Sequence, residues 1–350
     1  MAQVEPPPTR PAATLVEVAR VAGVSRATVS RVVNGSPKVS PDVRRTVERA
    51  IDRLGYVPNR AARSLVTRRS DSIAVVITEP ASRLFNDPFF PRLIRGVSAA
   101  LAARDLQLVL LMPDDEVDER RTVRYLTAGH VDGVILVSLH GDDPLPSQLA
   151  ARNIPVVVLA RPPHGVDVNY VDADNRDGAR RATVHLIDGG RRRIATITGP
   201  TDMVAGIDRL AGYRDALADA DLTIDPDLIA SGDFTHAGGA AAMDRLLAAR
   251  PDLDAVFCAS DLMAVGALGS LQAAGRRVPE DVAIVGYDDS PIATATRPAL
   301  TSVRQPIEEM GREMVHLLTE TLDQTDRIPR RVVLATELIA RASSARRAMP

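Results

Sequence analysis

The stretch "TLVEVARVAGVSRATVSRVV", residues 14–33, holds two short helical patterns around one glycine. Apolar residues recur at the three- and four-residue spacing of a single helix face, first at Leu15, Val18, Ala19 and Ala22, then at Val29, Val32 and Val33. Gly23 ends the first helix, and Ser25 is a good N-cap for the second. The short connection between them predicts the steep crossing of a helix-turn-helix.

A third helix is predicted from Ser40-Pro41 to the residue before Gly55. A capping serine followed by proline at the first helical position is a typical helix start. The apolar positions of this segment are Val43, Val47, Ala50, Ile51 and Leu54. Three short helices can share one small core, so residues 14–57 are expected to form an all-α domain, preceded by a disordered tail over residues 1–13.

The second predicted helix leaves a polar face outside this core. Arg26, Ala27, Ser30 and Arg31 face outward, with Thr28 and Asn34 at the margin. A helix of this width fits the DNA major groove, where arginine reads guanine and smaller polar residues grip phosphates. The candidate DNA contacts of this domain are Thr14, Ser25, Arg26, Ala27, Thr28, Ser30, Arg31 and Asn34. The alternative is a solvated face on a purely structural unit.

Charge separates the chain into a basic head and an acidic body. Residues 1–70 carry 13 Lys and Arg against 5 Asp and Glu, whereas residues 71–350 carry 30 against 40. Such an asymmetry suggests that the head meets a polyanion, although small helical domains are often basic by chance.

Residues 14–65 resemble the N-terminal region of the LacI/GalR family of bacterial transcription regulators. The pattern Val-Ser, two variable residues, then Thr-Val-Ser-Arg-Val is intact at residues 24–32. The resemblance implies that the variable positions, Arg26 and Ala27, choose the operator sequence. Arg26 would contact a base or, alternatively, a phosphate, and Ala27 a thymine methyl group.

The segment "NRAARSLV", residues 59–66, is too short to form a stable helix alone. The resemblance implies a hinge helix within residues 58–70 that forms when two subunits meet on DNA. Asn59, Ala62 and Leu65 match the family there, and Leu65 would enter the minor groove and bend the duplex. The alternative is a basic linker with Leu65 buried against the body.

From residue 71 the chain alternates short apolar runs with amphipathic stretches, which predicts parallel sheets covered by helices on both faces. Its length favours two lobes. The resemblance implies a body like the periplasmic sugar-binding proteins, with three crossovers between the lobes. We place the crossovers near residues 161–170, 288–298 and 303–306. Lobe one then covers residues 71–163 and 296–325, and lobe two residues 168–290 and 328–340.

The body lacks the motifs of common enzymes on parallel sheets. Lys38, in the head, is the only lysine, so a Walker A lysine in the body is excluded, and no GxSxG, HExxH or GxGxxG motif is found. The six histidines show no metal-ligand spacing. The body is expected to bind a ligand without catalysis, cofactor or metal.

Loops at the carboxyl ends of parallel strands would line the cleft between the lobes. By resemblance to sugar-binding relatives, the candidate effector contacts are Asp87, Phe89, Phe90, Arg161, Arg209, Phe234, Asp261, Asp288 and Gln305. Phe90 and Phe234 are alternatively core residues, and Asp261 is alternatively a helix N-cap. A small sugar, sugar acid or phosphorylated sugar fits this set. Met203 and Ala205 are apolar where the purine-responsive branch of the family is polar, so the resemblance disfavours a nucleobase.

Together these features predict a homodimeric repressor with a near-palindromic operator, whose DNA affinity a small sugar controls. Dimer contacts are expected near residues 91–104. One alternative is a catabolite-type regulator that answers to a protein partner, and another is a sugar-binding transport receptor. A single cysteine, Cys258, and the lack of an apolar leader or membrane-length run predict a cytoplasmic protein.

Overall fold

The computed structural model describes residues 13–33, 36–56, 69–162, 166–323 and 328–345. The chain divides into two compact units, residues 1–70 and 71–350, called here the head and the body.

The head consists of helices α1 (Leu15–Ala22), α2 (Arg26–Val33) and α3 (Pro41–Leu54), as the apolar spacing predicts. Thr14 and Glu17 form a capping box at the start of α1, and Gly23 ends that helix in a left-handed conformation (φ 66°). Gly55 ends α3 in the same way. The shared core contains Val18, Ala19, Val29, Val32, Val47, Ala50 and Tyr56. Val43, Ile51 and Leu54 are only half-buried at its edge.

Lobe one of the body contains a parallel sheet in the order β11-β5-β4-β3-β1-β2. Its strands are β1 (Ser72–Ile77), β2 (Gln107–Leu111), β3 (Gly133–Val137), β4 (Val156–Leu159), β5 (Asn169–Ala173) and β11 (Arg331–Leu334). Its helices are α5 (Ala81–Asn86), α6 (Phe89–Ala102), α7 (Glu116–Thr127), α8 (Leu145–Ala150) and α14 (Ile307–Asp323).

Lobe two repeats this plan with the order β12-β10-β9-β8-β6-β7, in which only β12 is antiparallel to its neighbour. Its strands are β6 (Ile194–Thr198), β7 (Ile229–Ser231), β8 (Ala255–Cys258), β9 (Ala283–Asp288), β10 (Thr301–Arg304) and β12 (Glu337–Ile339). Its helices are α9 (Asn175–Asp188), α10 (Val204–Asp219), α11 (His236–Ala249), α12 (Asp261–Ala273) and α13 (Pro291–Ala295), with 3-10 turns at Pro226–Leu228 and Ala342–Ser344.

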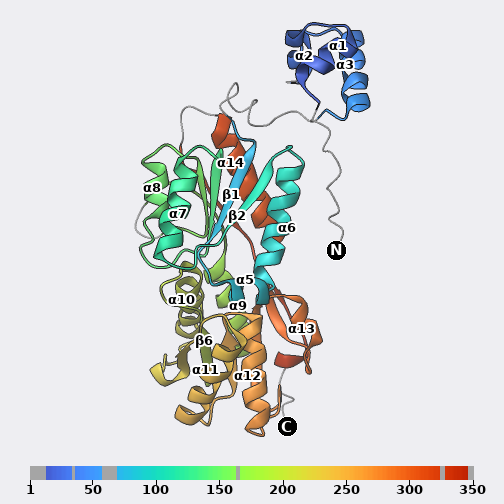
Figure 1. Ribbon diagram of the computed structural model, residues 1–350. Helices are drawn as coiled ribbons and strands as arrows, with labels where there is room; N and C mark the ends of the chain where they lie inside the picture. The colour runs from blue at the N-terminus through green and yellow to red at the C-terminus, as the bar shows by residue number, and fades with distance from the viewer. Residues whose placement is uncertain (1–12, 34–35, 57–68, 163–165, 324–327, 346–350) are drawn as a thin grey trace, which may run out of the picture. The chain divides into compact units, whose positions relative to one another are not determined.

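Each sheet is covered on both faces, because successive strand residues point to opposite sides. In β1, Ile73, Val75 and Ile77 pack with α6 and α14, whereas Ala74 and Val76 pack with α7 and α8 (Figure 1). In lobe two, α9 and α10 cover one face, and α11 and α12 cover the other. This confirms the predicted two-lobed body with parallel sheets.

The predicted lobe boundaries are wrong, although residues 303–306, predicted to hold the third crossover, hold the second. β5 pairs with β4, so the chain stays in lobe one until Ala173, beyond the predicted first crossover at 161–170. β10 pairs with β9, so the second crossover follows Arg304 and not residues 288–298. The third lies between Leu334 of β11 and Glu337 of β12, well after the predicted 303–306. The crossovers were misplaced because strands of mixed polarity, such as "NYVDA" in β5, do not show the apolar run by which the other strands were predicted.

Cys258 is fully buried in β8, and this burial raises the pKa of its thiol. Among the described residues no helix is long and apolar enough to cross a membrane.

Candidate effector cleft and DNA-contacting helix

A cleft lies where the carboxyl ends of the two sheets meet, the usual ligand position in open parallel sheets. The cavity measures about 830 Å³ with its open mouth included. Lobe one contributes loops after β1, β3, β4 and β5, and lobe two contributes loops after β6, β7, β8 and β9. The lining is mostly apolar with a few convergent polar groups, which is typical of a small-molecule site.

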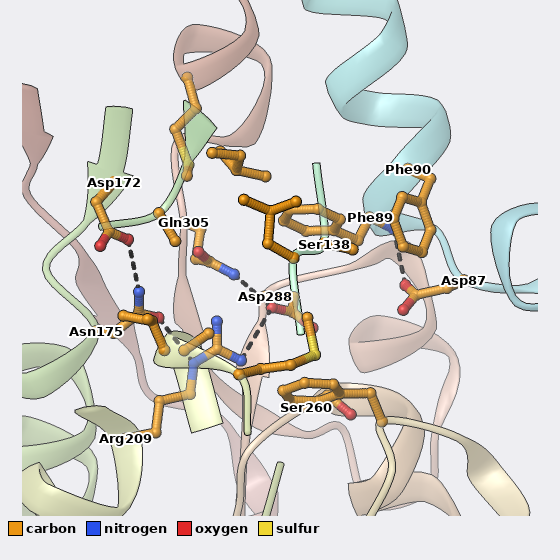
Figure 2. Close-up of a pocket in the computed structure, with 18 of the residues that line it drawn as sticks. Asp87, Phe89, Phe90, Ser138, Asp172, Asn175, Arg209, Ser260, Asp288 and Gln305 are labelled. Carbon is orange, nitrogen blue, oxygen red and sulfur yellow. Dashed lines mark hydrogen bonds and ion pairs between the residues drawn. The ribbon is translucent and has the colours of Figure 1, made fainter. Parts of the chain in front are cut away.

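A buried polar network centred on Arg209 forms the floor of the cleft (Figure 2). Nε of Arg209 donates to Oδ1 of Asn175 at 2.9 Å, and Nη1 donates to the carbonyl oxygen of Ala259 at 2.5 Å. The guanidinium also lies 3.7 Å from the centroid of the Tyr287 ring. Asn175 in turn donates to Oδ1 of Asp172 at 2.9 Å. These contacts fix the orientation of Arg209 before any ligand arrives.

Asp288 stands at the other end of this network. Its Oδ1 lies 3.8 Å from Nη1 of Arg209 and accepts a hydrogen bond of 2.6 Å from Nε2 of Gln305. Burial raises the pKa of Asp288, although Arg209 opposes this, and burial likewise raises the pKa of Asp172 to about 6. The cleft therefore holds carboxyl groups that are costly to charge and ready to accept or share hydrogen bonds with a polar ligand.

Aromatic rings form the walls. Phe89 and Phe90, at the start of α6, have ring centroids 5.4 Å apart at an interplanar angle of 90°. The backbone N–H of Phe89 donates to Oδ1 of Asp87 at 2.9 Å, which orients that carboxylate beside the rings (Figure 2). Phe234 of lobe two faces the cleft from a left-handed backbone conformation (φ 65°).

Several other lining residues share this rare conformation. Ser138 after β3, Ala160 after β4 and Asp288 at the end of β9 all have positive φ, at 60°, 71° and 104°. Such conformations are costly for residues other than glycine, and they cluster at ligand sites where the surrounding structure holds them.

Two polar contacts join the lobes at the rim. Nη2 of Arg161 donates to both carboxylate oxygens of Asp208 at 2.9 and 3.0 Å. His140 of lobe one lies 2.9 Å from Oδ2 of Asp202 in lobe two and 3.3 Å from Oε1 of buried Glu79. The hydrogen bond to Glu79, supported by that to Asp202, raises the pKa of His140 despite partial burial.

All of the predicted cleft residues except Asp261 line the cavity. The carboxylate of Asp261 is buried behind it, where it accepts from the Ser302 hydroxyl at 2.6 Å and the Ser290 N–H at 2.7 Å. Nor is Asp261 the N-cap, because the hydroxyl of Ser260 accepts from the backbone N–H of Met263. Asp261 thus fastens α12 to β10 and α13 and does not reach the cavity.

Sequence reasoning missed two members of the network, Asp172 and Asn175. Asp172 lies in β5 and Asn175 begins the helix that follows it, and the apolar pattern did not predict this strand. The signal available was the cluster "DADN" at residues 172–175, whose Asp174 caps α9 through the N–H of Asp177.

In the head, α2 presents the predicted polar face. Arg26, Ala27 and Arg31 are exposed, and neither arginine has an ion-pair partner in the described part of the head. Ser25 and Thr28 are joined by a 2.9 Å hydrogen bond, and Ser25 also accepts from the Thr28 N–H. Thr14 is engaged in the capping box, and Ser30 is half-buried. The predicted contacts at Asn34, Asn59, Ala62 and Leu65 lie outside the described residues.

No group of three or more acidic, histidine or cysteine side chains with metal-binding geometry occurs in the described ranges.

Comparison with known proteins identifies both units. Residues 14–59 match the model of bacterial regulatory proteins of the lacI family, and residues 183–344 match that of a periplasmic binding protein-like domain. The transcriptional regulator CelR of Thermobifida fusca is 54% identical over 333 residues, covering 94% of this chain and 98% of CelR. This chain belongs to the lacI family of regulators.

Solved structures of the family agree with the fold. A complex of the transcriptional regulator CelR with cellobiose is 51% identical, with a TM-score of 0.76, and covers 95% of this chain and all of that one. The lac repressor dimer bound to operator and the anti-inducer ONPF is 29% identical, with a TM-score of 0.83, and covers 96% of this chain and 100% of that one. These family members are a transcriptional regulator and a repressor.

Proposed function

We propose that this regulator is a homodimeric repressor, that its head binds a near-palindromic operator, and that a neutral disaccharide of the cellobiose class releases it by binding in the cleft. The observation that carries the proposal is the buried Asp172-Asn175-Arg209-Asp288-Gln305 network beside the rings of Phe89, Phe90 and Phe234, in a chain 54% identical to CelR.

The cleft suits a carbohydrate in two respects. Sugar rings have apolar faces that pack on aromatic rings, and half-buried Phe89 offers such a surface. Phe90 and Phe234 line the cavity beside it but are also core residues, only 1% and 7% exposed. Sugar hydroxyls both donate and accept hydrogen bonds, so they match a mixture of carboxyl, amide and guanidinium groups. Asp87, Asn175, Arg209 and Asp288 provide this mixture within one cavity.

Electrostatics favour a neutral sugar over a phosphorylated or acidic one. Each lining arginine already has a nearby carboxylate: Arg83 pairs with Glu79, Arg161 with Asp208, and Arg209 lies by Asp288. Asp87 and Asp172 add further acidic groups. A phosphate would meet no cation in this cavity that lacks a nearby carboxyl group, and the Asp87 and Asp172 carboxyls, whose pKa burial raises, suit neutral hydroxyl partners better than an anion.

For DNA, we propose that Arg26 and Ala27 of α2 read base edges in the major groove while Ser25, Thr28, Ser30 and Arg31 contact the backbone. Thr14, Asn34 and the hinge residues Asn59, Ala62 and Leu65 complete the proposed DNA-contact set. Two heads in a two-fold dimer would read two half-sites. Such a regulator acts in the cytoplasm, where operator and imported sugar meet.

The test is fluorescence anisotropy of the purified protein on duplexes from its own upstream region, titrated with cellobiose, glucose, glucose 6-phosphate and unrelated disaccharides. Salt is held constant because phosphate contacts make the affinity steeply salt-dependent. We expect cellobiose to weaken specific binding and glucose 6-phosphate to have no effect. A scrambled duplex is the control.

Three results would contradict parts of this proposal. Specific binding that no sugar changes would favour regulation by a protein partner. Specific binding that a sugar strengthens would reverse the sign of control. Conversion of cellobiose into another product during the titration, detected by chromatography, would show an enzyme.

A further inference from the structure

Arg83 is a cleft residue that neither the sequence motifs nor the family pattern singles out. It lies in α5, the short helix between β1 and α6, and its side chain lines the cavity while being only 14% exposed. Nη1 of Arg83 donates to Oε1 of Glu79 at 2.5 Å, and the Glu79 side chain is itself 3% exposed. The guanidinium is therefore held in one orientation by a buried carboxylate.

The same guanidinium lies between the aromatic walls of the two lobes. Its central carbon is 5.2 Å from the centroid of the Phe234 ring in lobe two and 6.0 Å from that of Phe90 in lobe one. Both distances are within the range of cation–π attraction. Arg83 thus lies close to the aromatic walls of both lobes and lines the cavity between them.

One donor of this side chain is unused. Nε of Arg83 is buried and has no hydrogen-bond partner. Of the buried side-chain atoms without a partner in the described residues, Nε of Arg83, the Tyr287 hydroxyl and the Ser290 hydroxyl, only the first belongs to a residue that lines the cleft. Buried donors of charged groups are nearly always paired, since leaving one unmade is costly.

We propose that Arg83 is an effector-binding residue whose Nε–H donates to an oxygen of the bound sugar, with Glu79 as the positioning residue that aims it. The inference rests on the proposed function and deepens it by assigning one hydroxyl-recognising contact. Because Glu79 already balances the charge of Arg83, the matching acceptor is a neutral hydroxyl or ring oxygen, in keeping with an uncharged sugar.

Arg83→Lys distinguishes a hydrogen bond to the sugar from a purely structural role, in which Arg83 only holds Phe90 of lobe one and Phe234 of lobe two in place. Lysine keeps the positive charge beside Glu79 and over Phe234, but it has no Nε–H donor at that position in the chain. By calorimetry we expect Arg83→Lys to bind cellobiose about 10-fold to 100-fold more weakly than the wild type. Sugar-free operator binding and the melting temperature are measured on the same preparation to show that the variant is folded. Arg121→Lys, on exposed α7, is the matched control.

Monodeoxy cellobioses supply a measurement that bracing alone would not alter. One analogue should bind the wild type more weakly than cellobiose does, yet bind Arg83→Lys as well as cellobiose does, because its missing oxygen is the partner of Nε. The double variant Arg83→Met with Glu79→Gln, which has no donor at the Nε position and leaves no buried carboxylate without its cation, repeats the measurement if the lysine variant melts early. Equal cellobiose affinity in wild type and variant, or equal losses across the whole deoxy series, would overturn the assignment while leaving the sugar effector intact. Failure of the wild type to bind any sugar tested would instead overturn the proposed function, and this assignment with it.

Discussion

The head and the cleft place their functional side chains in opposite environments. On α2, Arg26 and Arg31 are exposed and without ion-pair partners in the described head, whereas Arg209 in the cleft is 5% exposed and held by Asn175 and Ala259. DNA is a large polyanion that free arginines can meet from water. A small ligand offers few contacts, so its site must be arranged before it binds. In the head, the small core only has to hold α2 so that its arginines face the DNA. In the cleft, ligand binding depends on the buried polar network itself.

Val29→Asp is expected to have the largest effect, because it places a carboxylate in the small core of the head. Val29 is fully buried, and burying an unpaired charge costs several kcal/mol. We expect operator binding to fall more than about 100-fold, as an anisotropy titration would measure. Cellobiose binding by the body should persist. Val16→Asp, at a position 61% exposed, is the control, and loss of sugar binding in Val29→Asp would show that the two units do not fold separately.

Arg209→Met should produce the converse protein, one that binds operator but ignores sugar. The change removes the guanidinium that donates to Asn175 and to the carbonyl oxygen of Ala259 and that lies beside Asp288, and each buried polar partner left unsatisfied costs about 1–3 kcal/mol. Cellobiose affinity measured by calorimetry should fall at least about 100-fold. Arg176→Met removes an arginine that pairs with Asp215 at an exposed site, and it should change little. Normal induction of Arg209→Met would remove Arg209 from the binding network.

Arg26→Ala tests whether the exposed face of α2 reads bases. Loss of a bidentate contact to guanine costs about 1–3 kcal/mol, so operator affinity should fall about 5-fold to 150-fold. Discrimination against duplexes with substituted half-site bases should also relax. A uniform loss on all duplexes, with a shallower salt dependence, would instead mean that Arg26 holds a phosphate.

His140→Gln should have the smallest effect and should depend on pH. The contacts to Glu79 and Asp202 raise the pKa of His140 above 6.5. The stability that the charged histidine gives to this contact between the lobes is therefore fully present below pH 6.5, and it is lost as the pH rises through the raised pKa. Wild-type cellobiose affinity should therefore decline across that range by less than about fivefold, because the histidine is partly exposed. The same pH series on His140→Gln should lack this decline. Parallel curves for the two proteins would exclude the contact as a pH-sensitive link between the lobes.

The sequence predicted the structure correctly where a helix or strand is specified by its own local pattern of residues. The helices of the head, the cap of the second one by Ser25 and the helix ends at Gly23 and Gly55 match the expected pattern. The apolar runs at residues 72–78, 106–112, 132–138, 154–160, 193–199, 254–260 and 282–288, each a predicted strand, match β1, β2, β3, β4, β6, β8 and β9. In these segments, periodicity and chain-local signals are enough, because each buries its own apolar face.

It failed where a residue's role depends on distant segments. Which sheet accepts β5, β10 or β11 depends on pairing partners far along the chain, so the crossovers were misplaced. Asp172 and Asn175 belong to the polar network because the fold brings Arg209, more than thirty residues later in the chain, within hydrogen-bond distance of Asn175. Asp261 looked like a cleft acid, but its partners, Ser290 and Ser302, hold it behind the cavity wall.

The burial of Cys258 has a practical consequence for watching this protein work. The chain has one thiol, and that thiol lies inside lobe two where dissolved reagents do not reach it. Dye attachment can therefore be directed entirely to cysteines placed by mutation, without first removing the native one. Exposed Arg121 on α7 and exposed Asp244 on α11 put one such position in each lobe. A fluorophore pair at these two positions would act as a molecular ruler for lobe movement in single molecules when the proposed effector is added or removed.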